Sequence, residues 1–219
     1  MFYNYARLVF TVFGLGIGFT GYYLDMVLQV GYEGWIWLAT TFILSLGGFA
    51  AGGLIQRLSA SSLTDFLTGL YNRRFFYLRL DEEEARASRK KKPLCIAMID
   101  VDDFKAVNDT YGHVQGDLLL CELAGILKNN TRFTDIVARW GGDEFAIIFS
   151  ETPLPNACEI MERIRSKVEQ AFSPYELTIS AGIMTLEPEQ NLKDLLIMAD
   201  QALYEAKARK NSVTAVAVF

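Results

Sequence analysis

Cysteine is scarce in this sequence, and basic residues are outnumbered by acidic ones. Its three cysteines, Cys95, Cys121 and Cys158, lie far apart within apolar runs and form no C-x-x-C pair. This spacing argues against a disulfide framework or a cysteine metal site and predicts buried free thiols in a reducing cytosol. The chain has 21 Lys and Arg against 26 Asp and Glu. Because basic residues do not exceed acidic ones, the composition argues against nucleic-acid binding. It does not exclude a nucleotide substrate, because metal ions can neutralise the phosphates.

Charge is almost absent from the first sixty residues. The charged side chains there are four: Arg7, Asp25, Glu33 and Arg57. A helix needs about 20 mostly apolar residues to cross the hydrocarbon core of a membrane. The pattern predicts two transmembrane helices over residues 5–28 and 34–56, joined by a short outer loop and followed by a short linker to about residue 60.

Two other interpretations of this segment compete with a transmembrane hairpin. The helices could be core helices of a soluble domain, or the first could be a cleaved signal peptide, although no small-x-small cleavage site closes it. The outer loop has no Lys or Arg, while Arg7 and Arg57 lie at the opposite ends. The positive-inside rule therefore predicts both termini in the cytoplasm.

Small residues recur at four-residue spacing within both apolar segments. Gly14 and Gly18 form one pair, and Gly48 and Gly52 form the other. Such spacing lets helix backbones approach closely. It serves either packing within one hairpin or dimerisation between chains, and the pattern leaves both open.

Helical and strand patterns alternate from Asp65 onward, which predicts an α/β sandwich with one sheet covered by helices. The expected helices span residues 74–89, 116–127, 156–171 and 192–208. The expected strands span residues 94–101, 135–140, 144–149, 177–186 and 213–219. Two glycines, Gly141 and Gly142, suit the turn of a hairpin between the second and third strands.

Acidic side chains lie at the ends of two of these strands. Asp100 ends one, and Asp143 and Glu144 follow the hairpin glycines. Carboxylates from two neighbouring strands suit Mg²⁺, which binds through a few carboxylates plus substrate phosphates. The alternative is that residues 100–103 are solvated loop acids and that the glycines form a plain turn.

Five ordered segments resemble the GGDEF family of diguanylate cyclases. They are residues 65–74, 100–105, 108–117, 139–145 (Arg-Trp-Gly-Gly-Asp-Glu-Phe) and 199–207. The resemblance covers about residues 63–219, within a predicted domain of residues 61–219. It implies an α+β nucleotidyl-cyclase-like fold with a mostly antiparallel central sheet, here preceded by the transmembrane hairpin. Together with the predicted hairpin, it predicts a catalytic domain in the cytoplasm, held at the bacterial inner membrane by a multi-pass anchor.

The resemblance also implies roles for individual residues. Asp100, Glu144 and the Val101 carbonyl would hold Mg²⁺ or Mn²⁺, and Asp143 would assist deprotonation of the attacking hydroxyl or share a metal. Five residues are expected to bind or make room for the substrate phosphates: Phe104, Lys105, Gly141, Gly142 and Lys207. The family glycine after the last helix is missing, so either Arg209 or Lys210 would supply the second phosphate-binding cation.

Asn108 and Asp117 are expected to bind the guanine edge. A carboxylate accepts from N1–H and the 2-amino group of guanine, which adenine lacks, so Asp117 should reject ATP. His113, the only histidine, is expected to have a structural role. Arg73 and Arg74 either contact substrate or cap the first helix of this domain, and the structural role is favoured. Residues 75–77 are expected to be core and surface aromatics.

The expected reaction joins two GTP into cyclic di-GMP, which requires a homodimer because each domain supplies half a site. Arg132, Asp135 and Arg163 resemble the family's inhibitory site for cyclic di-GMP. The alternatives are an inactive domain that serves as a GTP or cyclic di-GMP receptor, and a membrane scaffold.

Overall fold

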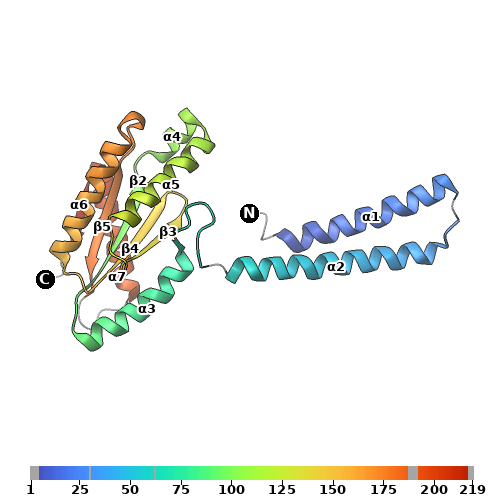
Figure 1. Cartoon of the computed structure of the whole chain (residues 1–219), viewed down its shortest axis with the longest axis horizontal. Helices are drawn as coiled ribbons and strands as arrows, with labels where there is room; N and C mark the ends of the chain where they lie inside the picture. Colours follow the sequence, from blue (N-terminus) through green and yellow to red (C-terminus); the bar gives the residue numbers. More distant parts are fainter. Residues whose placement is uncertain (1–4, 30, 62, 187–191, 217–219) are drawn as a thin grey trace. The chain divides into compact units, whose positions relative to one another are not determined.

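Two long apolar helices, α1 (Ala6–Leu28) and α2 (Gly34–Ser61), form an antiparallel hairpin in the computed structural model (Figure 1). The structure describes residues 5–29, 31–61, 63–186 and 192–216. Mean hydropathy is 1.3 over Ala6–Leu28 and 1.7 over Gly34–Ile55, and only 11% of each span is buried. By length and composition both helices can cross a membrane. Their low burial is unlike that of core helices in a soluble domain.

Glycines let the two helices of the hairpin touch backbone to backbone. A Cβ added to Gly14 would lie 2.8 Å from the carbonyl carbon of Leu44, and one added to Gly52 would lie 2.6 Å from the Cα of Arg7. A Cβ on Gly48 would overlap the carbonyl oxygen of Phe10. These glycines therefore serve packing within one chain, one of the two uses that the sequence left open.

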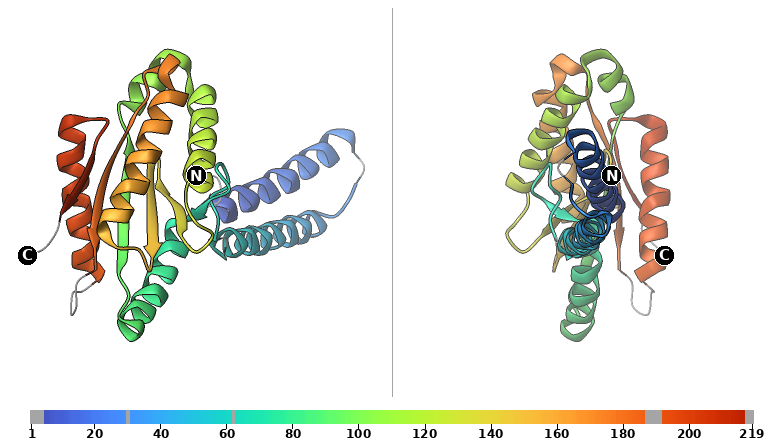
Figure 2. Two further views of the ribbon diagram at one scale, coloured as in Figure 1. Left: turned by 60° about the vertical axis from the view of Figure 1, so that its left-hand side comes forward. Right: turned by 90° about the vertical axis from the view of Figure 1, so that its right-hand side faces the viewer.

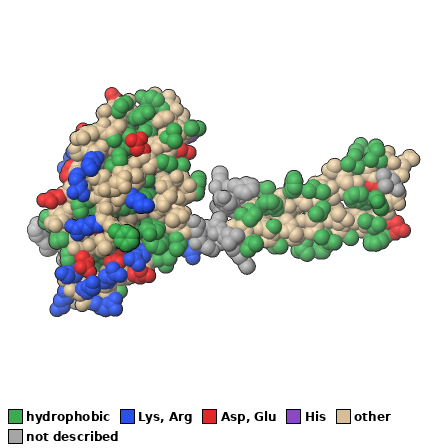
Figure 3. All heavy atoms as spheres, viewed as in Figure 1, with side chains coloured by type: hydrophobic (Ala, Val, Ile, Leu, Met, Phe, Trp, Pro, Cys, Tyr) green, Lys and Arg blue, Asp and Glu red, His purple; other side chains and the backbone are tan. Residues whose placement is uncertain are grey.

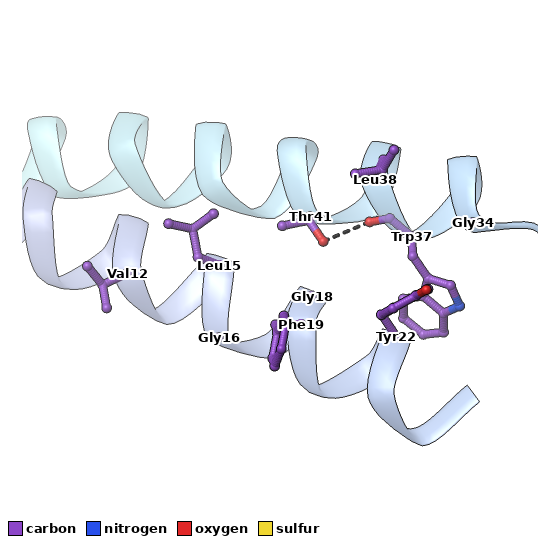
Figure 4. Close-up of a pocket in the computed structure, with 10 residues that line it drawn as sticks. All are labelled: Val12, Leu15, Gly16, Gly18, Phe19, Tyr22, Gly34, Trp37, Leu38 and Thr41. Atoms are coloured by element: carbon purple, nitrogen blue, oxygen red, sulfur yellow. Dashed lines mark hydrogen bonds between the residues drawn. The ribbon is translucent and has the colours of Figure 1, made fainter. Parts of the chain in front are cut away.

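A carboxylate links α1 to α2 near the loop that joins the two helices. Asp25 accepts hydrogen bonds from the Trp37 indole at 3.1 Å and from the Tyr32 amide at 3.3 Å. A cavity of about 720 Å³ opens beside this end, and the Thr41 hydroxyl in its wall donates to the Trp37 carbonyl (Figure 4). The lining contains no charged side chain: Val12, Leu15, Gly16, Gly18, Phe19, Tyr22, Gly34, Trp37, Leu38 and Thr41.

A six-stranded sheet forms the centre of the second unit of the chain, Leu63–Phe219. The strand order is β1-β3-β4-β2-β5-β6. The strands are β1 (Tyr71–Asn72), β2 (Leu94–Val101), β3 (Ile136–Gly141), β4 (Glu144–Ser150), β5 (Ile179–Thr185) and β6 (Val213–Val216). The inner pairings β3–β4, β4–β2 and β2–β5 are antiparallel, and both edge strands pair in parallel. The predicted mostly antiparallel sheet is confirmed.

Helices cover both faces of this sheet. Figure 2 shows α5 (His113–Asn129) and α6 (Leu154–Ala171) on one face and α7 (Leu192–Arg209) on the other. α3 (Arg73–Lys90) packs on the same face as α7, through Phe76 and Leu80. Every residue of β2 is buried, which explains why residues 94–101 form an unbroken apolar run.

Most predicted segments form with ends shifted by a few residues, while three short elements were missed. α4 (Phe104–Tyr111) has eight residues and one buried side chain, Val107, and β1 has two residues, so each is too short to give a strong periodic signal. A 3₁₀ turn, η2 (Ser173–Tyr175), precedes β5. The last strand is described as far as Val216, and residues 217–219 lie outside the described part of the chain.

Two smaller expectations can be compared with the fold. The three cysteines are free thiols, Cys95 buried and the others half-buried. The cap of α3 is Asn72, whose side chain accepts from the Phe75 amide at 3.0 Å. The expected capping by Arg73 was therefore wrong, since a guanidinium has no acceptor to offer amides. Figure 3 shows mixed basic and acidic groups on the sheet unit and mainly hydrophobic side chains on the hairpin.

Candidate active site

Two acids from neighbouring strands face the same side of the sheet. Asp100 on β2 is directly opposite Glu144 on β4 in the antiparallel register. Opposed residues in such a ladder project to one face, with Cβ atoms about 5 Å apart. Ile99 and Phe145, one position along, belong to the core beneath α5 and α6. Asp100 and Glu144 therefore lie on the face that α7 covers.

Lys207, in the last turn of α7, reaches these acids. Its ammonium lies 2.8 Å from Asp100 Oδ2, and the Asp100 side chain is only 6% exposed. Burial raises the pKa of Asp100 to about 6; Lys207 opposes this, while the charges of Asp143 and Glu144 add to it. Burial also disfavours the charge on Lys207, but pairing with Asp100 outweighs it and raises the Lys207 pKa. The site is thus a concentration of negative charge with one cation at its edge.

The turn between β3 and β4 differs from the expected one. Gly141 is still paired, opposite Glu144, so the two-residue turn is Gly142–Asp143 and not the two glycines. Of the two turn residues, Gly142 is the one with a positive φ, 54°. The Asp143 carbonyl accepts from the Val101 amide at 3.3 Å, which holds the turn beside the end of β2.

Arg139, whose role the sequence did not reveal, holds this turn. Its guanidinium donates twice to the Gly142 carbonyl, at 2.9 and 2.7 Å, and once to Asp65 at 3.0 Å. Asp65 Oδ1 also accepts from the Thr68 amide and hydroxyl. Both residues occur in the resembling segments, but only their contact across the fold indicates a supporting role.

Asn108 on α4 packs against Gly116 near the start of α5, and Gly116 is the residue before Asp117. A Cβ on Gly116 would overlap Asn108 Oδ1 and lie 3.2 Å from the Phe104 ring. Gly116 is therefore the residue that allows Asn108 to lie beside the segment carrying Asp117. Asp117 itself is exposed, as is Lys105 on α4. The first residue of α5, His113, is also exposed.

The two candidate cations after Lys207 have different partners. Lys210 pairs with Asp103 at 2.5 Å, beside the start of α4. Arg209 donates to the Thr214 hydroxyl on β6. Of the two candidates, Lys210 is therefore the cation that lies near the acids at the end of β2. Arg209 is directed instead to the edge strand β6.

The donor set fits a divalent cation that substrate helps to bind. Among the residues that the structure describes, no three His, Cys, Asp or Glu side chains converge to hold a metal by themselves. Mg²⁺ does not need such a cage, because it binds through one or two carboxylates and substrate phosphates. Asp100 and Glu144 supply hard oxygen ligands, and the charges crowded around Asp100 favour a cation there.

The three residues of the expected inhibitory site lie around one segment between α5 and β3. Asp135 is buried and accepts from the Arg132 amide at 2.8 Å. Burial raises the pKa of Asp135, against the effect of that amide. Arg163 on α6 donates to the carbonyl of Asn130 at 2.9 Å. The Arg132 side chain is exposed.

Comparisons with known proteins agree with this geometry. Residues 62–212 match the family model described as diguanylate cyclase, GGDEF domain. Diguanylate cyclase A of Treponema denticola is 37% identical over 182 residues, 78% of this chain and 48% of that protein. Diguanylate cyclase DgcP of Pseudomonas aeruginosa is 39% identical over 151 residues, 67% of this chain and 22% of that protein. The chain thus spans between about a fifth and a half of these relatives.

The fold has solved counterparts as well. The GGDEF domain of DgcB from Caulobacter crescentus, crystallised in complex with c-di-GMP, has a TM-score of 0.66 and is 34% identical. The match covers 71% of this chain and 96% of that domain. The match to the family model, the shared fold and the paired acids of β2 and β4 lead to one conclusion: this chain belongs to the GGDEF family of diguanylate cyclases.

Proposed function

We propose that this protein is an active diguanylate cyclase that condenses two GTP into cyclic di-GMP and two pyrophosphates. The observation that carries the proposal is the pairing of Asp100 with Glu144 across β2 and β4, with Lys207 at their edge. A buried acid such as Asp100 beside the half-buried Glu144 is costly unless cations offset their charge. A receptor or scaffold that bound no metal would have no need for this arrangement.

In this proposal Asp100, Glu144 and the Val101 carbonyl would hold Mg²⁺, with Asp143 beside them. When bound, the ion would neutralise charge on the triphosphate and on the pyrophosphate leaving group. Phe104 and Lys105 begin α4, and helix N-termini suit phosphates because their amides point at the ligand. Lys207 and Lys210 would bind phosphate oxygens by charge, and Gly141 and Gly142 leave room for them.

Asn108 and Asp117 would select guanine in this half-site. The proposal is supported by the contact of Asn108 with Gly116, which brings both residues to one junction of α4 and α5. The exposed Asp117 carboxylate can accept from N1–H and the 2-amino group, and with adenine it would lose both bonds.

Two copies would have to meet for the reaction. The 3′-hydroxyl of each GTP attacks the α-phosphate of the other, so one domain offers half of the catalytic site. The helices α1 and α2 would anchor the protein in the inner membrane with the sheet domain in the cytoplasm. Anchoring raises the chance that two domains meet.

Cyclic di-GMP is the proposed inhibitor at Arg132, Asp135 and Arg163. Guanidinium groups bind phosphate bidentately and stack on guanine, and a carboxylate can accept from the base. The common segment that these residues contact supports a single site.

Full-length protein in detergent, incubated with GTP and Mg²⁺ and analysed by chromatography, tests the function. Cyclic di-GMP should appear, and Glu144→Gln should reduce its formation at least 100-fold, since a metal ligand is lost. Glu151→Gln, one residue beyond the other end of β4, is the matched control and should retain the parent rate. GTP binding without product would indicate a receptor, and turnover that survives excess chelator would contradict the metal assignment.

A further inference from the structure

Asp102 is a buried acid next to the proposed metal strand that the reaction above does not use. It lies between β2 and α4 and is 7% exposed. Its carboxylate accepts three hydrogen bonds: from the Ser180 hydroxyl at 2.7 Å, the Thr178 hydroxyl at 2.7 Å and the Asn211 amide at 2.9 Å. All three donors are neutral. A buried carboxylate held by three hydrogen bonds from neutral groups is well suited to a fixed position.

The third donor belongs to the turn that follows α7. Lys210 and Asn211 in this turn have φ angles of 54° and 44°, and neither is glycine. The left-handed region is unfavourable for Lys and tolerated by Asn, so contacts of this turn with its neighbours help to hold Lys210 there. The bond from the Asn211 amide to Asp102 is a buried contact that does so.

The two lysines beside this turn have partners that substrate would compete for. Lys207 pairs with Asp100 and Lys210 with Asp103, and the two lysine side chains are 44% and 57% exposed. The Lys210–Asp103 pair is exposed on both sides, and such ion pairs are weak. In the Lys207–Asp100 pair the acid is buried, but the lysine is partly exposed and accessible to a phosphate. Lysines that bind a triphosphate must release these acids, whereas the bond between Asp102 and Asn211 can persist unchanged.

We propose that Asp102 is a positioning residue, which keeps the end of α7 against the end of β2 while Lys207 and Lys210 exchange their acids for the triphosphate. The inference rests on the proposed function, because it assigns these lysines to substrate phosphates. It predicts that Asp102 affects the binding of nucleotides through the two lysines and not directly.

A second set of contacts at Asn211 provides a control. Its side chain accepts from Arg165 at 2.7 Å and donates to Glu169 at 2.8 Å, both on α6. Asn211→Gly removes these contacts, keeps the amide for Asp102 and suits the positive φ. It separates the link to α6 from the link to Asp102.

Binding of 3′-deoxy-GTP to the full-length protein, measured by calorimetry, tests the proposal. This nucleotide lacks the attacking hydroxyl and cannot react. Asp102→Asn should weaken its binding about 10-fold, because loss of the charged acceptor loosens the lysines. GMP, which lacks the β- and γ-phosphates, should bind Asp102→Asn within about 2-fold of the parent, and Asn211→Gly should match the parent for both ligands.

A mutant cycle distinguishes positioning from general destabilisation. In a Lys207→Ala, Lys210→Ala background, Asp102→Asn should cause no further loss of 3′-deoxy-GTP binding. Additive losses, or equal weakening of GMP, would overturn the proposal.

Hydrogen exchange without nucleotide tests the contact itself. Amides of residues 210–212 should exchange faster in Asp102→Asn while those of β2 stay protected. Unchanged protection would also overturn the proposal. A parent protein that binds 3′-deoxy-GTP but forms no cyclic di-GMP from GTP would refute the proposed function alone, and the binding cycle would still decide the role of Asp102.

Discussion

Arg139 and Asp65 form a 3.0 Å ion pair that joins β3 to the loop leading into β1, across 74 positions of sequence. Their side chains are only 12% and 16% exposed. Because the same guanidinium holds the Gly142 carbonyl, the pair links the opening loop of the domain to the turn beside the proposed metal site. Hydrogen bonds to charged groups in such shielded positions contribute more than surface pairs.

We expect Asp65→Asn to lower the free energy of unfolding at neutral pH by about 2 kcal/mol. Burial alone would raise the pKa of the Asp65 carboxyl, but hydrogen bonds from Thr68 and Arg139 outweigh it and lower the pKa below 3.8. The ionised carboxylate therefore stabilises the fold above that value, and the stabilisation is lost as pH falls through the folded-state pKa. Thermal unfolding across the acid range should show this loss in the parent and not in Asp65→Asn. Asp109→Asn, which changes an exposed side chain of α4, is the control and should keep the parent profile. Identical profiles of all three proteins would contradict the prediction.

Substitution of Asp117 should change nucleotide selection. Asp117→Ser removes the acceptor that adenine leaves unpaired, so ATP should inhibit turnover of GTP at least 10-fold better than in the parent. The KM for GTP should rise with little change in protein stability, because Asp117 is exposed. Initial rates with mixed nucleotides measure both effects. Unchanged discrimination against ATP would remove Asp117 from base recognition.

Arg132→Ala should relieve product inhibition and leave the initial rate intact. The Arg132 side chain is exposed, and its amide, which binds Asp135, is retained in the variant. Progress curves with added cyclic di-GMP should show noncompetitive inhibition of the parent and at least 10-fold weaker inhibition of the variant, since a phosphate-binding guanidinium is lost. Lys167→Ala, which loses a contact to the Asn130 side chain, is a nearby control expected to remain inhibited. If Arg132→Ala is inhibited like the parent, the site lies elsewhere.

Adjacent glycines of α2 should tolerate alanine very differently. A Cβ at Gly48 would overlap the Phe10 carbonyl, whereas one at Gly47 meets nothing within 4 Å. Gly48→Ala should force α1 and α2 apart and lower the melting temperature of the hairpin in detergent. Gly47→Ala, with the same gain in helix propensity, should not. Circular dichroism of both variants measures the difference, and equal melting temperatures would exclude backbone contact between the helices at this position.

The sequence by itself determined the elements with strong local signals. The unbroken apolar run of residues 94–101 became the fully buried β2, because a strand covered on both faces has no polar positions. The two uncharged segments became α1 and α2, and the ordered motifs identified the family. Asp100 and Glu144 could be placed at the ends of neighbouring strands, since Asp100 lies near the end of one predicted strand and Glu144 begins another.

Tertiary structure decided the contacts between groups that are distant in sequence. Whether Gly14 and Gly48 pack within one chain depends on the helix opposite, and the function of Asp102 depends on donors 76 to 109 positions away. Residue spacing along a chain specifies which face of a helix or strand a side chain occupies, but not its partner. Partners are chosen by packing of the whole sheet and its helices, because burial requires each polar group to find a donor or acceptor there.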